Sequence, residues 1–88
     1  MKIRNVVVRS EHGLHARVAA SVVKVAHNHE SSVSIQCEGC PRANAGSIME
    51  LLMLEAGMGT RLQVMAEGSD EDAVVDAIAD VFEQGDGI

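Results

Sequence analysis

Gly13-Leu14-His15-Ala16-Arg17 marks the junction between an expected strand and the first turn of an expected helix. A helix start gathers unpaired backbone N–H groups and the positive end of the helix dipole, so it favours a bound phosphate. An imidazole at this place can attack phosphorus, and Arg17 adds a permanent fork-shaped cation for phosphoryl oxygens. We therefore expect His15 to be an exposed phosphoryl acceptor. The backbone amides expected to hold the phosphate are those of Ala16, Arg17 and Val18.

Hydrophobic periodicity predicts the elements on either side of this junction. Residues 2–9 are rich in valine and indicate a strand, and apolar residues at helical spacing indicate a helix over 16–27. Further strands are predicted at 32–37, 42–44 and 61–66, with Glu38-Gly39 as the turn of a hairpin. The order β-α-β-β-α-β-α favours an α+β fold with the helices on one face of an antiparallel sheet. Strand order is not readable from this pattern.

Two further helices are indicated by their first turns. Ser47-Ile48-Met49-Glu50 has the spacing of a capping box, and a short helix follows to about residue 54. Ser69-Asp70-Glu71-Asp72 places acidic groups at the start of the last helix, where they suit the dipole. Gly85 is a natural stop for that helix. Its expected buried stripe consists of Ala73, Val74, Ala77, Ile78, Val81 and Phe82.

Composition limits the class of protein. The 88 residues form a single expected domain, 1–88. A net charge of −6 with one aromatic residue, Phe82, argues against nucleic-acid binding. No apolar run approaches the ~20 residues that span a bilayer, and Met1-Lys2-Ile3-Arg4-Asn5 lacks the apolar region of a secretory signal. We therefore expect a cytoplasmic location. We also expect a monomer and no cofactor.

The chain resembles the HPr family, the small histidine phosphocarriers of the bacterial phosphotransferase system. The resemblance covers essentially the whole chain. It rests on Gly13-Leu14-His15-Ala16-Arg17, on Asn44-Ala45-Gly46-Ser47-Ile48-Met49, and on Ala66-Glu67-Gly68-Ser69-Asp70-Glu71. The run Leu51-Leu52-Met53-Leu54-Glu55 is closer to the nitrogen-branch relatives, called NPr, than to the sugar-branch carriers.

This resemblance implies an open-faced sandwich, with a four-stranded antiparallel sheet covered on one side by three helices. It also implies a relay rather than an enzyme: enzyme I, charged from phosphoenolpyruvate, passes a phosphoryl group to Nδ1 of His15, and a IIA-type acceptor takes it. Arg17 matches the family arginine that contacts the phosphoryl group. Val18 replaces the usual proline, which fixes φ and lacks an N–H, so we expect an altered lifetime or transfer rate.

The resemblance also assigns a partner surface and a regulatory residue. The partner surface comprises Leu14, Arg17, Ile48, Met49 and Leu52. Within the short helix we expect Leu51 and Leu54 to face inward, and Met49 and Leu52 to face outward. Ser47 matches a position that a regulatory serine kinase phosphorylates in some carriers, with a phosphatase as its counterpart, but Ser47 is also a good N-cap. Lys24 and His27 match basic contacts of the family or lie on a solvated face.

Cys37-Glu38-Gly39-Cys40 places two thiols across the expected hairpin turn. Reduced cysteines without a role are the favoured interpretation, and a reducible disulfide is the alternative. A zinc site with His27 and His29 requires ligands from separate elements, so no metal site is expected. His12 lies near His15 in sequence and either contacts the phosphoryl group or has no role.

Two other functions compete with the phosphocarrier. A small metal chaperone of ferredoxin-like fold also uses a pair such as Cys37 and Cys40, but it places them before its first helix. His15 occupies that place in this chain. A regulatory relative that binds partners without carrying phosphate is the second alternative, and the presence of His15 counts against it.

Overall fold

The computed structural model describes residues 1–84 and contains the predicted order of strands and helices. Gly85, the expected helix stop, lies outside the described residues. The elements are β1 (Lys2–Val7), α1 (Ala16–His27), β2 (Ser32–Cys37), β3 (Ala43–Asn44), α2 (Ile48–Met53), β4 (Arg61–Glu67) and α3 (Glu71–Gln84).

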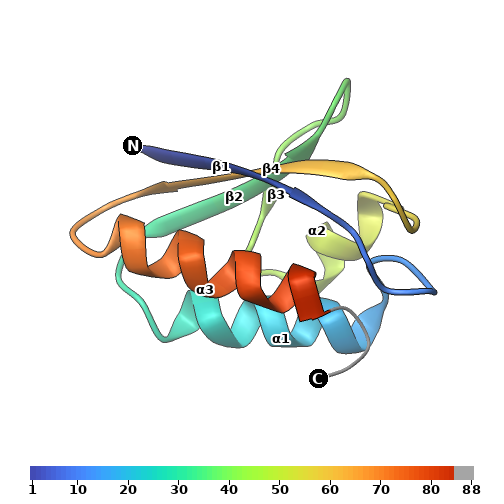
Figure 1. The fold of residues 1–88 in the computed structure, drawn as a ribbon. Coiled ribbons are helices and arrows are strands. Elements are labelled where there is room, and N and C mark those ends of the chain that lie inside the picture. The colour runs from blue at the N-terminus through green and yellow to red at the C-terminus, as the bar shows by residue number, and fades with distance from the viewer. Residues whose placement is uncertain (85–88) are drawn as a thin grey trace.

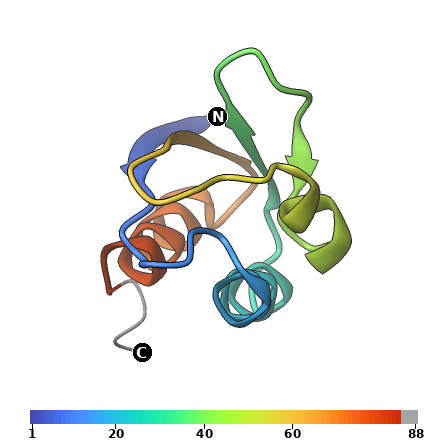
Figure 2. The same ribbon diagram turned by 90° about the vertical axis from the view of Figure 1, so that its right-hand side faces the viewer.

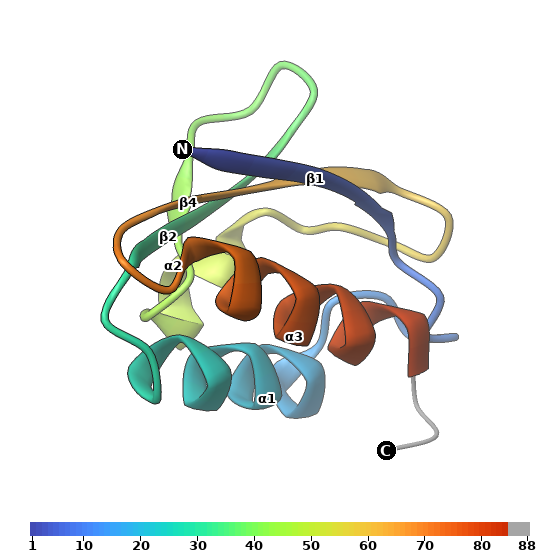
Figure 3. The same ribbon diagram turned by 60° about the vertical axis from the view of Figure 1, so that its left-hand side comes forward.

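The strands form one antiparallel sheet in the order β1-β4-β2-β3. β4 is central, and its Met65 pairs with Ile3 of β1 on one side and with Ser34 of β2 on the other. The helices lie on one face of the sheet and leave the other face open (Figures 1 and 3). The predicted fold class is therefore confirmed.

Alternating side chains of the inner strands explain why the helices cover one face. In β2 every second side chain is buried, and β4 follows the same alternation except that Met65 is buried as well. The buried alternating side chains are Val33, Ile35, Cys37, Leu62, Val64 and Ala66. β1 is an edge strand and ends at Val7 rather than at residue 9, because Val8 leaves the ladder and exchanges hydrogen bonds with Gly59 and Thr60.

The buried stripe of α3 differs from the predicted one. Ala73 is exposed and Ala77 is only half-buried, whereas Val75 and Ala79 are buried. α3 packs against β1, β4 and α1 at once, so the buried part of its surface is wider than one stripe and centred on other positions. The buried residues of α3 are Val74, Val75, Ile78, Ala79, Val81 and Phe82.

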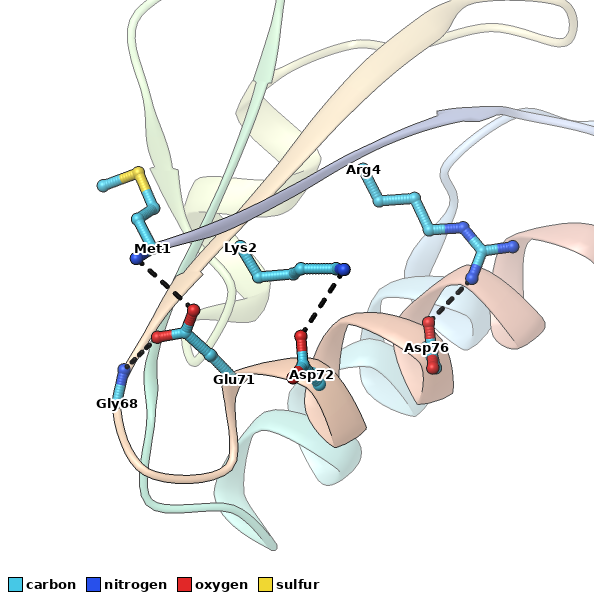
Figure 4. A network of polar contacts seen from close by, with 7 residues as sticks. All are labelled: Met1, Lys2, Arg4, Gly68, Glu71, Asp72 and Asp76. Atoms are coloured by element: carbon cyan, nitrogen blue, oxygen red, sulfur yellow. Dashed lines mark hydrogen bonds and ion pairs between the residues drawn. The ribbon is translucent and has the colours of Figure 1, made fainter.

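Ion pairs fasten the edge strand β1 to α3 (Figure 4). The guanidinium of Arg4 lies 2.8 Å from the carboxylate of Asp76. Lys2 lies 3.5 Å from Asp72, and the terminal amine of Met1 lies 3.3 Å from Glu71. Because these groups remain largely in water, each pair contributes little to the stability of the fold.

Asp70 joins the loop before α3 to the loop before β2. Its carboxylate accepts hydrogen bonds from the backbone N–H groups of Glu30 and Ser31, both at 2.9 Å, and from the hydroxyl of Ser31. The Ser31 hydroxyl and then the Glu30 amide lower the pKa of Asp70 below its ordinary value.

The β2–β3 hairpin contains the predicted turn, but β3 is shorter than expected and begins at Ala43. The N–H of Cys40 donates to the carbonyl of Cys37 at 3.1 Å, and Gly39 has φ +77°. The turn brings the two cysteine Cα atoms to 5.3 Å, and the sulfurs form a disulfide. The expectation of reduced thiols is therefore wrong for this structure.

Candidate functional site

The loop before α1 is held by contacts that fix where the helix begins. Gly13 has φ +74°, and a Cβ at this position would lie 2.5 Å from the carbonyl oxygen of Ala56. That carbonyl accepts the N–H of Leu14 at 2.8 Å, and the hydroxyl of buried Ser10 donates to the carbonyl of Gly13. Only glycine fits this conformation and this close approach. The loop therefore sets His15 at the helix start.

His15 is the N-cap residue of α1. Its backbone is extended, with φ −92° and ψ 178°, and its carbonyl accepts the N–H of Ala19 at 2.9 Å. Its Nδ1 accepts the N–H of Arg17 at 3.3 Å. Because the ring folds back over the first turn to make this bond, it is half-buried rather than exposed as predicted. In the neutral ring, a nitrogen that accepts a hydrogen bond carries no proton, so acceptance at Nδ1 places the ring proton on Nε2.

The surroundings of His15 suit an anion. The first turn of α1 contains no acidic residue, so no carboxylate competes for the dipole. Arg17 is exposed, and within residues 1–84 the structure shows no ion pair to its guanidinium. The exposed ring of His12 lies edge-on to His15, with 6.2 Å between ring centroids. A phosphoryl group at His15 would thus lie at a helix start, two residues before an exposed arginine.

The three residues expected to supply backbone amides to the phosphate differ in the burial of their side chains. Ala16 is exposed, whereas the side chain of Val18 is 3% exposed and belongs to the core. Val18 therefore anchors the first turn through its side chain. Its backbone N–H, which the usual proline lacks, lies in the same turn as that of Arg17.

The helix α2, which packs against α1, bears an apolar surface. We call Ile48, Met49, Leu52 and Met53 the α2 surface; their exposed fractions are 39%, 74%, 36% and 76%. Leu51 is fully buried and Leu54 is half-buried, which agrees with the expected inward orientation of both. Met53 was missed by sequence reasoning, although its spacing of four from Met49 places both on one helix face.

Leu14, by contrast, is not a surface residue. Its side chain is 5% exposed and packs in the hydrophobic core, so its predicted place on the partner surface is wrong. The reason is the loop geometry: the bond from its N–H to Ala56 turns the chain so that the side chain points inward. The same hydrogen bond joins the segment after α2 to the loop before α1.

The expected capping box at Ser47 is only half present. The hydroxyl oxygen of Ser47 accepts the N–H of Glu50 at 3.2 Å. The carboxylate of Glu50 accepts the N–H of Asn44 at 3.0 Å instead of the N–H of Ser47. Glu50 therefore ties α2 to β3, and the N–H of Ser47 donates to the carbonyl of Asn44.

The other histidines do not approach the cysteines to form a metal site. His27, which is exposed like Lys24, contacts the carbonyl of Gly46 through Nε2 at 3.2 Å, and His29 contacts the carbonyl of Val25 through Nδ1 at 2.7 Å. In the described part of the chain no three His, Cys, Asp or Glu side chains are grouped to hold a metal ion.

The helices were also compared with the length and apolar character of a membrane-spanning segment. None of those within residues 1–84 combines the length and the apolar character needed to cross a bilayer.

Comparison with known proteins identifies the family of this arrangement. A family model described as "PTS HPr component phosphorylation site" matches residues 2–84. The phosphocarrier protein NPr of Shewanella violacea is 39% identical over 75 residues, covering 85% of this chain and 81% of that protein. The phosphocarrier protein HPr of Treponema pallidum is 36% identical over 83 residues, covering 94% and 93%. The crystal structure of HPr-C-His from Thermoanaerobacter tengcongensis superposes with a TM-score of 0.92 at 32% identity, covering 100% of this chain and 98% of that one.

Proposed function

This chain belongs to the HPr family of phosphotransferase-system phosphocarriers, and from that membership we propose that Nδ1 of His15 is its phosphoryl acceptor. Enzyme I, charged from phosphoenolpyruvate, is the proposed donor, and a IIA-type protein is the proposed acceptor. The protein acts as a monomeric, stoichiometric carrier in the cytoplasm. The observation that carries the proposal is the hydrogen bond between Nδ1 of His15 and the N–H of Arg17 at the start of α1.

The chemistry begins with the release of that hydrogen bond, because the lone pair that accepts it is also the nucleophile. Nδ1 of His15 then bonds to phosphorus in line as the bond between phosphorus and the donor breaks, while Nε2 keeps its proton. The N–H of Arg17 is then available to a phosphoryl oxygen, and the guanidinium of Arg17 can swing to another. The helix dipole contributes ~0.3–2 kcal/mol to holding the anion, which tunes the transfer without trapping the group.

The proposed docking surface for both partners is the α2 surface together with Arg17. An exposed cluster of large apolar side chains next to a reactive group is typical of a protein interface. Methionine suits a surface that meets more than one partner, because its unbranched side chain repacks easily. The link from Leu14 to Ala56 supports this proposal, since it couples the segment after α2 to the loop that carries His15.

Ser47 is proposed as a structural cap rather than as a regulated site. Its hydroxyl oxygen already accepts the N–H of Glu50, so phosphorylation would disturb the start of α2. It would also place negative charge beside the Glu50 carboxylate, which disfavours the modified form. Incubation with a serine kinase and ATP, read by intact mass, tests this assignment, and stoichiometric phosphorylation of Ser47 would overturn it.

Reconstitution with enzyme I and phosphoenolpyruvate tests the carrier function directly. We expect an intact-mass increase of one phosphoryl group that is labile in acid, and its loss in His15→Ala. His27→Ala is the matched control, because it removes an exposed imidazole at the opposite end of the same helix. Undiminished labelling of His15→Ala would overturn the proposal. Because the similar proteins include both NPr and HPr, the acceptor panel must contain IIA domains of the nitrogen and the sugar branch.

A further inference from the structure

We propose that the Cys37–Cys40 disulfide is a reversible redox-modification site, which a dithiol attacks at Cys40 and which controls how firmly α2 is held. The second half of the proposal rests on the proposed docking role of the α2 surface. Disulfides in a reducing cytoplasm are typically transient or redox-sensing rather than structural. In a cytoplasmic carrier we therefore expect this pair to exist both as a disulfide and as two reduced thiols.

The two cysteine residues differ in their exposure to solvent. Cys37 belongs to β2, faces the helices and is only 9% exposed. Cys40 is half-buried and lies in loop 38–42, which projects from the sheet on the side away from the helices (Figures 1 and 2). Its neighbours Gly39 and Pro41 are exposed and small or compact. An incoming thiolate therefore reaches Cys40 and not Cys37.

The exchange proceeds in two balanced steps. A thiolate of the dithiol attacks Sγ of Cys40, the Cys37–Cys40 bond breaks, and Cys37 leaves as a thiolate that takes up a proton. The second thiolate of the dithiol then attacks the mixed disulfide, and Cys40 leaves as a thiolate that is also protonated. Two electrons and two protons pass to the cysteines, and the dithiol becomes a cyclic disulfide. A disulfide oxidant reverses both steps.

The hairpin that this bond closes also connects α2 to the sheet. β3 pairs with β2 through two residue pairs, Ser34 with Asn44 and Ile35 with Ala43. α2 contacts β3 and α1, and the N–H of Asn44 donates to the Glu50 carboxylate at 3.0 Å. A ladder of two residue pairs has little cooperativity of its own. The disulfide-closed loop between β2 and β3 therefore helps to keep the two strands paired.

A side-chain hydrogen bond also spans the hairpin turn. The Gln36 side-chain amide, next to Cys37, donates to the carbonyl of Cys40 at 2.6 Å. Reduction removes the covalent closure and leaves β3 held by its hydrogen bonds and by the packing of the small side chains of Ala43 and Ala45 in the core. We therefore expect β3 to fray and α2 to become more mobile in the reduced protein, with slower docking of partners.

Thiol trapping tests the site itself. The oxidised protein is incubated with glutathione and then alkylated with iodoacetamide, and the peptides are mapped by mass. We expect no alkylation before reduction, a glutathione adduct on Cys40, and alkylation of both cysteines after full reduction by dithiothreitol. An adduct on Cys37, or purified protein whose thiols resist oxidation, would overturn the proposal. His15→Ala must behave identically, so this result is independent of phosphoryl transfer.

Hydrogen exchange tests the consequence for α2. We expect amide exchange in β3 and α2 to be several-fold faster in the reduced protein than in the oxidised protein, with unchanged exchange in β1 and β4. The double variant Cys37→Ser/Cys40→Ser should reproduce the reduced protein and show no response to dithiothreitol. Equal exchange of α2 in the two states of the natural protein would overturn the proposed control. Phosphoryl transfer from enzyme I should slow several-fold on reduction, and only in the protein that has both cysteines.

Discussion

The backbone N–H of Arg17 lies 3.3 Å from Nδ1 of His15 and donates a hydrogen bond to it. The same pair of groups serves both states of the proposed carrier. In the unphosphorylated state Nδ1 caps the helix, and after transfer the N–H is available to a phosphoryl oxygen. The site therefore needs a small movement of one ring rather than a rearrangement of the loop.

Val18→Pro should change the lifetime of the phosphohistidine by about two- to fivefold, because a single dipole or amide interaction at a helix start is worth ~0.3–1 kcal/mol. The measurement is the hydrolysis rate of the purified phosphoprotein. Val18→Ala is the control: it keeps the N–H and removes the buried side chain, so it separates loss of the donor from loss of packing. The same lifetime in Val18→Pro and in the natural protein would show that this N–H has no part in holding the phosphate.

Gly13→Ala should lower the free energy of unfolding by roughly 1–3 kcal/mol, because it combines a left-handed backbone with a clash. The added Cβ would lie 2.5 Å from the carbonyl oxygen of Ala56 and disturb the bond from Leu14. Urea unfolding measures the loss. Gly39→Ala has a similar φ of +77° and nothing within 4 Å of the new Cβ, so it should cost less. Equal losses in the two variants would contradict the role of the Ala56 contact.

Asp70→Asn should destabilise the protein at neutral pH, and the difference from the natural protein should shrink in acid. The pKa of Asp70 is lowered in the folded state from its ordinary 3.8, chiefly by the Ser31 hydroxyl. A group with a depressed pKa stabilises above its unfolded value, and this stabilisation is lost as the pH falls through the folded value. Urea unfolding of both proteins at pH 7 and at decreasing pH below about 4 checks this, and a pH-independent difference would contradict it.

Met49→Ser/Met53→Ser should raise the KM for enzyme I several-fold while leaving stability within about 0.5 kcal/mol, since both side chains are largely exposed. Ile3→Ser is the matched control, because Ile3 is an exposed apolar residue of β1, at the opposite edge of the sheet from β3, the strand that α2 contacts. Leu51→Ala, which empties a fully buried position of α2, should instead cost roughly 2–5 kcal/mol of stability. An unchanged KM for the double variant would remove the α2 surface from the docking proposal.

The order of the elements and the place of His15 were predictable because both depend on local patterns. Helical spacing after Gly13 locates the start of α1, and a polar residue just before a periodic segment is a recognisable N-cap signal. The inward turn of Leu14 was not predictable. It depends on the Ala56 carbonyl, which reaches the loop only through the tertiary fold.

The strand order and the cysteine bond lay beyond local patterns for a similar reason. β4 becomes central through pairing with β1, which is distant in sequence, and alternation within a strand does not encode its neighbours. The turn at Glu38-Gly39 was predicted, and it does bring the cysteines together. Whether two such sulfurs are bonded depends on the redox conditions as well as on the geometry.

The central position of β4 also bears on the synthesis of the protein. β1 is synthesised before α1, but the strand with which it pairs, β4, is made after β2, β3 and α2. Until then the nascent chain can form little more than α1, α2 and the β2–β3 hairpin, while β1 and the β4-facing edge of β2 stay unpaired. Folding of the sheet is therefore a late, nearly all-or-none event, and a ribosome that stalls before residue 67 leaves a product that chaperones or proteases must handle.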